Sequence, residues 1–358
     1  MDLSAEAFAR VTGSGRTGFF ARWDWRGAIR ALMAAVAIAF AAPGAAAAQQ
    51  TYLLVVAGLS GEPAFATRFH EWGSTLVRAA EERHSVPASN IYYFAERPER
   101  DPELIDGPAR RENIEAAIRE IAERAGPGDA VFIVLIGHGS YDGRESMFNL
   151  TGADMSAEDW AAQLDLLAEQ RVAFVNAASA SGDFIRVLSK PGRAIATATR
   201  DGRQNNATIF PQYFVTAFSE DVADSDRDGR ISLLEAYEYA RREVARDFQS
   251  TGRLQTEHAS LDDNGDGTGT HEPDPQSGDG AFARGIYLGG TGWVAAEDAS
   301  PELQALFGER QRLENELNTL RASRATMQPD AYDAELERLL IELARVSQSI
   351  RELEEAAP

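Results

Sequence analysis

The chain has 358 residues, of which 44% are hydrophobic and 25% charged, a composition that suits one large or two modest globular domains and excludes a disordered or fibrous protein. Its formal net charge of -21 argues against a nucleic-acid backbone or an anionic membrane surface as the main partner. Cysteine is absent, which excludes disulfides, thiolate metal sites and a cysteine nucleophile.

The first 48 residues have the three-part form of a secretory signal. Arg22, Arg26 and Arg30 precede the apolar run "ALMAAVAIAFAAPG", and the small-residue stretch "AAAAQQ" follows it. We therefore expect a signal peptide over residues 1–48, export to the periplasm or the extracellular space, and no membrane span after cleavage. An uncleaved anchor is the alternative, although the apolar run is short for a membrane span.

From Thr51 the chain alternates short apolar runs with amphipathic segments, a βαβ rhythm. Strands are predicted at residues 51–59, 90–96, 129–139, 171–179, 192–199 and 283–290. Helices are predicted at residues 66–84, 111–125, 156–168, 211–218 and 233–248. Continuous apolar runs such as Val131 to Ile136 are typical of strands covered on both faces. The pattern predicts an α/β domain over residues 49–295, with a mainly parallel six-stranded sheet sandwiched by helices.

After about Ala295 the composition changes, and residues 296–358 are predicted to form a helical hairpin or coiled coil. Apolar residues recur at helical spacing on both sides of a break and cap at Pro329 and Asp330. They are Leu306, Leu313, Leu317 and Leu320, then Tyr332, Leu336, Leu339, Leu343, Val346, Ile350 and Leu353. Three roles stay open for residues 301–355: self-association or binding of a partner helix, packing on the main domain, or a solvated appendage.

Two loops stand out because functional groups gather at the carboxyl ends of parallel strands. His138 lies between Gly137 and Gly139, after the strand that ends at Ile136. Ser179 follows the strand that ends at Asn176. One helix separates the two strands, as in the crossover that makes parallel strands neighbours. We expect the histidine and the serine hydroxyl to lie near each other, whereas a simple turn is the structural alternative for each motif alone.

The segments "VFIVLIGHGSYDG" and "VAFVNAASASGDF" resemble the caspase and legumain superfamily of cysteine peptidases, in which His-Gly follows one strand and Cys-x-Ser-Gly the next. The stretch "ATATRDGRQNNATIFPQYFVTAF" resembles the strand and helix after the nucleophile in legumain-like bacterial members. The resemblance spans residues 51–290 and implies a caspase-like fold. It places His138 on the catalytic base, Gly139 on the oxyanion-hole backbone and Ser179 on the cysteine.

The same resemblance implies that Arg200, Asn206 and Thr208 rim the cleft and bind substrate, with capping and loop contacts as the alternative. A peptide or protein ligand is therefore expected there. The acid that lines the specificity pocket of legumain-like enzymes, two residues before the cysteine, is replaced by Ala177. Asparagine specificity is therefore not carried over.

The departure at Ser179 decides the functional prediction. A serine hydroxyl needs a general base during attack, usually oriented by a third group, and Asp142 is the nearest carboxylate to His138 in the sequence. We expect an exported peptidase homologue that is catalytically degenerate and serves as a peptide-binding or scaffold protein. The alternative is an active endopeptidase with a Ser179/His138 dyad, supported by calcium, in which the N–H groups of Gly139 and Ser179 hold the peptide carbonyl.

The segment "DSDRDGRISLLE", residues 224–235, matches the EF-hand calcium loop. It predicts side-chain ligands at the first, third, fifth and twelfth positions, a backbone carbonyl at the seventh, and a direct or water-mediated ligand at the ninth. The predicted ligands are Asp224, Asp226, Asp228, Arg230, Ser232 and Glu235. Four carboxylates this close repel one another unless a hard dication neutralises them, so we expect structural Ca²⁺. A solvated acidic turn is the alternative.

A Gly/Asp-rich loop at residues 262–280 begins with Asp262, Asn264, Asp266 and Gly267 at the same offsets. Its twelfth position, however, is Pro273. It is either an incomplete calcium loop or a turn, and the sequence favours the turn.

Overall fold

The computed structural model describes residues 49–220, 222–226, 229–276, 278–289, 300–322 and 327–356. The predicted signal peptide at residues 1–48 lies outside the described residues. Among the helices so described, none combines the length and hydropathy that a membrane span requires.

The centre of the fold is a seven-stranded sheet in the order β10-β9-β8-β4-β1-β2-β3. Its strands are β1 (Thr51–Ala57), β2 (Ile91–Ala95), β3 (Gly107–Pro108), β4 (Ala130–Ile136), β8 (Arg171–Asn176), β9 (Arg193–Thr197) and β10 (Ser260–Asp262). Every neighbouring pair is parallel except β9 and β10. The predicted α/β fold with a mainly parallel sheet is confirmed, and the sheet has one strand more than predicted.

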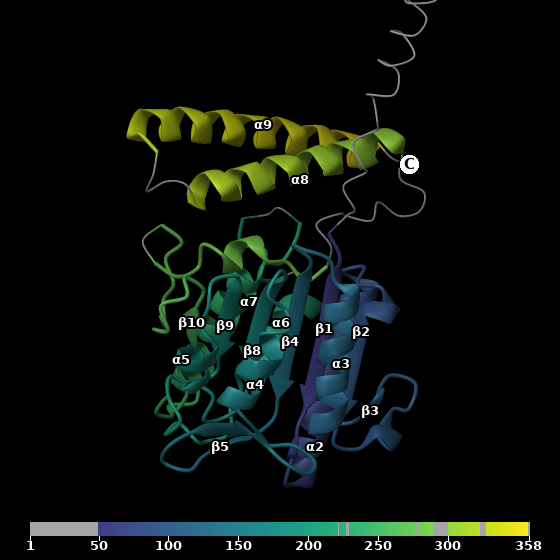
Figure 1. Ribbon diagram of the computed structural model, residues 1–358, viewed down its shortest axis with the longest axis vertical. Coiled ribbons are helices and arrows are strands. Elements are labelled where there is room, and N and C mark those ends of the chain that lie inside the picture. The colour runs from purple at the N-terminus through teal and green to yellow at the C-terminus, as the bar shows by residue number, and fades with distance from the viewer. Residues whose placement is uncertain are drawn as a thin grey trace, which may run out of the picture. The chain divides into compact units, whose positions relative to one another are not determined.

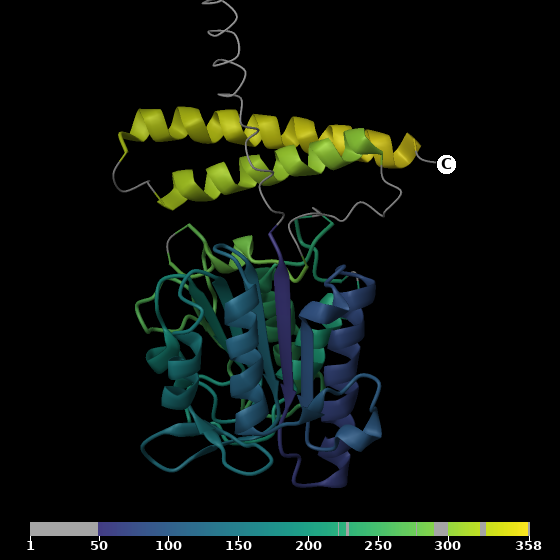
Figure 2. The same ribbon diagram turned by 45° about the vertical axis from the view of Figure 1, so that its right-hand side comes forward.

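Helices cover both faces of this sheet (Figures 1 and 2). One face packs against α2 (Pro63–Glu82), α6 (Phe210–Ser219) and α7 (Leu233–Ser250). The other packs against α3 (Arg111–Arg124), α4 (Ala157–Leu164) and α5 (Phe184–Leu188). In β1, Leu53 and Val55 enter the first cluster while Leu54 and Val56 enter the second, all fully buried. This two-sided burial explains why the strand sequences are continuously apolar.

The strand predicted at residues 283–290 is wrong. Residues Ala283–Gly285 form a short 3-10 helix, and Tyr287 makes an isolated bridge with Ser232. The Asp263 carboxylate accepts hydrogen bonds from the backbone N–H groups of Gly280, Phe282 and Ala283, at 2.7 to 2.8 Å. These bonds hold the segment in a turn, and β10 pairs with β9 at the sheet edge instead.

A second, three-stranded antiparallel sheet follows β4 directly. It contains β5 (Gly139–Tyr141), β6 (Ser146–Phe148) and β7 (Met155–Ser156). Its strands are too short to show an alternating pattern, so the sequence did not predict them. Its first residue is Gly139, which places this small sheet beside the candidate site.

The C-terminal segment contains α8 (Pro301–Ala322) and α9 (Pro329–Ala356), which pack together as the predicted hairpin (Figure 1). The predicted apolar seam is its core, because Leu313, Leu317, Leu320, Tyr332 and Leu339 form one buried cluster. The hairpin therefore has a hydrophobic core of its own.

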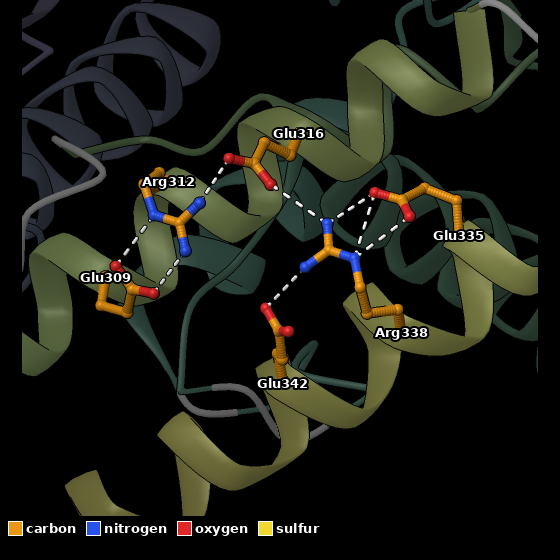
Figure 3. Close-up of polar contacts among 6 residues, drawn as sticks. All are labelled: Glu309, Arg312, Glu316, Glu335, Arg338 and Glu342. Atoms are coloured by element: carbon orange, nitrogen blue, oxygen red, sulfur yellow. Dashed lines mark hydrogen bonds and ion pairs between the residues drawn. The ribbon is translucent and has the colours of Figure 1, made fainter.

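An ion-pair network runs along the hairpin surface (Figure 3). Arg312 pairs with Glu309 and Glu316 within α8, and Arg338 pairs with Glu335 and Glu342 within α9. Glu316 also reaches Arg338 across the two helices, at 3.6 Å. Exposed ion pairs add little to stability, so the apolar seam carries the packing and this network helps to set the register.

Candidate active site

The two predicted loops leave the sheet at the same edge. Strands β4 and β8 are parallel neighbours, with Leu135 opposite Asn176. Gly137 and Ala177, the first residues after the two strands, therefore begin loops that lie side by side. This arrangement is the one predicted from the single crossover helix.

His138 is half-buried beneath the start of α2. Its imidazole ring contacts the rings of Phe65 and Phe69, both edge-on, with centroids 4.6 and 5.1 Å away. Burial lowers the pKa of His138, while a hydrogen bond to the Ser60 backbone and the charge of Glu62 oppose that shift. The hydrogen bond favours the protonated ring, so the imidazole donates and the Ser60 carbonyl accepts. The ring is thus oriented by a backbone carbonyl.

Ser60 is itself held by a carboxylate that sequence analysis did not identify. Glu96 follows β2 and accepts hydrogen bonds from the Ser60 backbone N–H, at 3.1 Å, and from the Ser60 hydroxyl. Because His138 binds a backbone carbonyl, no residue type in the sequence marks this partner. The one available signal was position, since Ser60 follows β1, the parallel neighbour of β4.

Asp142 does not orient His138. Its carboxylate accepts hydrogen bonds from the backbone N–H groups of Arg144 and Glu145, at 2.8 and 3.0 Å. These backbone hydrogen bonds lower the pKa of the Asp142 carboxyl group. Asp142 is a turn residue in the connection between β5 and β6.

Ser179 is bound to the backbone of Gly139. Its Oγ accepts a hydrogen bond from the Gly139 N–H at 3.1 Å and donates to the Gly139 carbonyl at 3.2 Å. Ser179 is 2% exposed. The structure describes Ser179 and His138, and among the described residues no hydrogen bond joins the Ser179 hydroxyl to the His138 imidazole. The structure thus brings Ser179 to Gly139 but leaves the serine and the histidine unbonded.

The backbone around Ser179 has the shape of a tight strand-to-helix turn. Ala180 has φ +54°, a left-handed conformation that costs a residue other than glycine about 1 kcal/mol. Thr199 holds the turn, because its hydroxyl accepts hydrogen bonds from the N–H groups of Ser181 and Gly182 at 2.8 and 3.0 Å. A β-carbon at Gly182 would lie 2.1 Å from the carbonyl carbon of Arg200, so the position requires glycine.

One backbone donor at this turn is free. The Ser179 N–H has no hydrogen-bond acceptor within the part of the chain that the structure describes, whereas Ala178 donates to Asn176 and Ala180 donates to Gln204. The predicted oxyanion hole pairs this N–H with that of Gly139. Of these two N–H groups, that of Ser179 has no acceptor among the described residues, and that of Gly139 donates to the Ser179 hydroxyl.

The three predicted substrate-binding residues lie in different environments. Arg200 and Asn206 are exposed, and the Arg200 guanidinium lies 4.0 Å from the Asp201 carboxylate. Thr208 is buried, and its hydroxyl donates to the Ala177 carbonyl at 2.6 Å. This hydrogen bond thus anchors the loop that carries Ser179. A role in contacting substrate stays a prediction for all three.

The predicted calcium loop brings three carboxylates together. Oxygens of Asp224, Asp226 and Glu235 lie within 4.8 Å of one another, and Asp228 lies outside the described residues. Glu235 is nearly buried and forms a capping box with Ser232 at the start of α7. Gly229 has φ +80°, which the sharp turn of such a loop requires. Three of the six predicted ligands therefore lie close together, and calcium binding stays a prediction.

Positive charge also surrounds this loop. The Arg284 guanidinium lies 3.5 Å from the Asp226 carboxylate. Arg230 is buried, and its guanidinium lies 3.8 Å from the centre of the Tyr287 ring. Tyr287 in turn bridges the backbone of Ser232. The exit of the loop is therefore packed against residues 284–287.

Residues 109–264 match the model of the Peptidase C13 family, the legumain family. The match supports a legumain-like peptidase homologue. It spans less than half of the chain, but it includes both strand ends, Ser179, His138 and the acidic loop. The crystal structure of protein GSU0716 from Geobacter sulfurreducens covers 65% of this chain and 96% of its own length. It is 12% identical, with a TM-score of 0.41, and at that score it adds nothing to the assignment. No curated protein matches the chain.

Proposed function

We propose that this legumain-like peptidase homologue is catalytically degenerate and binds extended peptides at the edge of the sheet formed by the ends of β4 and β8. The observation that carries the proposal is the pair of hydrogen bonds between the Ser179 hydroxyl and the Gly139 backbone. These bonds use the hydroxyl proton and also one of its lone pairs. A nucleophile needs its proton directed at a base, and here the proton is directed at a carbonyl.

The chemistry of serine explains why this bonding matters. A cysteine thiol, with a pKa of about 8.5, can be stabilised as a thiolate beside a protonated imidazole. A serine hydroxyl has no comparable ionised state and depends on proton transfer during attack. An imidazole could still act as a general base for a serine, but the Ser179 hydroxyl directs its proton at the Gly139 carbonyl and not at His138. A change from thiol to hydroxyl in this setting removes the step that activates the nucleophile.

The remaining features are suited to peptide binding. The free Ser179 N–H is a donor for a peptide carbonyl, and the neutral His138 ring lies against the apolar rings of Phe65 and Phe69. Backbone-to-backbone hydrogen bonds with an extended ligand give affinity without cleavage. The extended peptide would thus be held by the kind of groups with which a peptidase positions its substrate.

We also propose that the loop at residues 224–235 binds structural Ca²⁺ through Asp224, Asp226, Asp228 and Glu235, with Arg230 and Ser232 as further ligands. Its support is the closeness of the described carboxylates and the position of Glu235 at the start of α7. Bound there, the cation would neutralise the carboxylates and fasten α7 to the loop.

Two further proposals concern location and partners. The arginines and apolar run before residue 48 support export to the periplasm or the extracellular space. The hairpin supports self-association or binding of a partner helix, because Leu340 and Ile341 on α9 are 47% and 45% exposed.

The test is intact-mass analysis after treatment with a fluorophosphonate, with Ca²⁺ and with chelator. We expect no adduct on the wild-type protein in either state. Ser179→Cys introduces the single thiol of the chain, and we expect iodoacetamide to modify it once, faster than it modifies Ser179→Cys/His138→Ala. That reaction checks that the turn is accessible to a small electrophile.

A wild-type fluorophosphonate adduct that Ser179→Ala and His138→Ala both abolish would overturn degeneracy and establish the Ser179/His138 dyad. Peptide binding is measured separately. Blocked tetrapeptide amides are titrated into labelled protein, and the expected result is a shift of the Ser179 amide resonance. Absence of any shift at that amide across the peptide set would contradict the binding role.

A further inference from the structure

The loop at residues 262–267 repeats the first half of the predicted calcium loop. Both have the pattern Asp-x-Asp/Asn-x-Asp-Gly, here Asp262, Asn264, Asp266 and Gly267. The sixth residue has a positive φ in both, +80° at Gly229 and +76° at Gly267. The sequence favoured a simple turn for the second copy because its twelfth position is a proline.

Hydrogen bonds fold the three oxygen-bearing side chains back along this loop. Asp262 Oδ1 accepts from the Gly265 N–H at 3.1 Å, and Asn264 Oδ1 accepts from the Asp266 N–H at 2.8 Å. Asp266 Oδ1 accepts from the Thr268 N–H at 2.7 Å. Such turns occur with or without an ion, so these bonds by themselves do not define a site.

The second oxygen of Asp262 does point to a ligand. Asp262 is 0% exposed, and its Oδ2 is buried without a hydrogen-bond partner among the described residues. Leaving a buried charged oxygen unpaired is costly, and native structures rarely do so. The other oxygen of the same carboxyl group binds the Gly265 N–H, so the group faces the loop. The next residue, Asp263, differs because backbone N–H groups fill both of its oxygens.

We propose that residues 262–268 form a second divalent-cation site, of the calcium class, at which the cation satisfies Asp262 Oδ2. Asn264 and Asp266 supply further side-chain oxygens, and the Thr268 carbonyl lies at the seventh position of the pattern. An all-oxygen set in an irregular loop suits Ca²⁺, which accepts six to eight ligands in flexible geometry, better than Mg²⁺, which demands a near-octahedral set. Water completes the shell. The proposal is independent of peptide binding and of the loop at residues 224–235.

The structure also indicates what this cation would hold in place. Ser189 Oγ donates to Asp262 Oδ1 at 3.1 Å and accepts from the Gly267 N–H at 2.9 Å. Ser189 is the C-cap of α5, the helix that follows the Ser179 turn. Cation binding at Asp262 therefore fastens the connection between α5 and β9 to the edge strand β10.

The test is calorimetric titration of the chelator-treated full chain with CaCl₂. We expect two sites in the wild-type protein, one in Asp262→Asn and one in Glu235→Gln, with at least a tenfold loss of affinity at the altered site. Asp274→Asn is the matched control, because it removes one exposed carboxylate from the same Gly/Asp-rich loop outside the six-residue pattern. This control should retain two sites.

Hydrogen exchange locates the effect. Ca²⁺ should slow exchange over residues 184–195 and 260–270 in Glu235→Gln, and that protection should be absent in Asp262→Asn. The proposal is overturned if Asp262→Asn binds Ca²⁺ as the wild type does while Glu235→Gln binds none. Wild-type protein that binds no Ca²⁺ overturns both loops. Circular dichroism of each chelator-treated variant shows whether a lost site reflects an unfolded chain.

Discussion

The two strand ends of the candidate site differ in how their functional groups are held. At the end of β4, the His138 ring is packed between two aromatic rings and oriented by the Ser60 carbonyl, which Glu96 supports. At the end of β8, the Ser179 hydroxyl is bound to the Gly139 backbone. The His138 ring is thus held by aromatic packing and a backbone carbonyl, whereas the Ser179 hydroxyl is held by direct hydrogen bonds to the neighbouring loop.

This difference teaches that the backbone shape of a turn and the bonding of the side chain on it are set by separate contacts. The Ser179 turn has a left-handed residue at Ala180, support from Thr199 and a backbone N–H with no acceptor among the described residues, while the Ser179 hydroxyl is bonded to Gly139. The reactivity of the displayed atom depends on a few contacts of its own.

Gly139 lies against Ser179 where the two strand ends meet, and a substitution there should lower the free energy of unfolding most. In Gly139→Ala the new β-carbon would lie 2.3 Å from the Ser179 carbonyl oxygen and 2.9 Å from that of Met147, so backbone must move. We expect a loss of about 3 kcal/mol or more in the free energy of unfolding, measured by denaturant titration. Gly278→Ala meets nothing within 4 Å and serves as the control. Equal stability of the two variants would show that the strand ends are not locked together.

The free energy of unfolding should depend on pH through the carboxyl group of Glu257. This carboxylate is 3% exposed and accepts hydrogen bonds from the Ile209 and Phe210 N–H groups at the start of α6. Burial raises the pKa of Glu257 from 4.5 to about 7. Because the folded pKa is the higher one, its favourable contribution is complete below about pH 4.5 and is lost as the pH rises through 7.

Glu257→Gln keeps an acceptor and removes the charge. From pH 5 to pH 8 we expect this variant to gain stability relative to the wild type by about 2.5 kcal/mol, from 1.36 kcal/mol per pKa unit. Thermal unfolding at both pH values measures the change, with the exposed Glu220→Gln as control. A stability difference that stays constant with pH would mean that Glu257 ionises in the folded protein as freely as in the unfolded chain.

The smallest effect is expected on the His138 side. Glu96→Gln weakens the hold on Ser60, whose carbonyl supports the protonated His138 ring. This change lowers the pKa of His138. Nitrogen-15 chemical shifts of the ring report the titration. The exposed Glu99→Gln controls for charge alone, and an identical shift in both variants would remove Glu96 from a positioning role.

The sequence predicted the parts of this protein that depend on local pattern. Continuous apolar runs identified β1, β4, β8 and β9 because a strand buried on both faces has to be apolar throughout. Steps of three and four residues identified the hairpin seam, because the helical repeat alone brings those side chains to one face. The Gly-His-Gly and Ser-Gly motifs were found because turn residues interrupt the apolar pattern at strand ends.

Tertiary structure alone decided how the site is bonded. The Ser60 carbonyl, the Gly139 N–H and the Ser179 N–H are backbone groups, and every residue type except proline carries the same ones, so no letter in the sequence marks them. Glu96 and Glu257 act across 36 and 48 residues of chain, at distances that only the completed sheet closes. The sequence determined which side chains stand at the strand ends, and the packing of the sheet decided which atoms they bind.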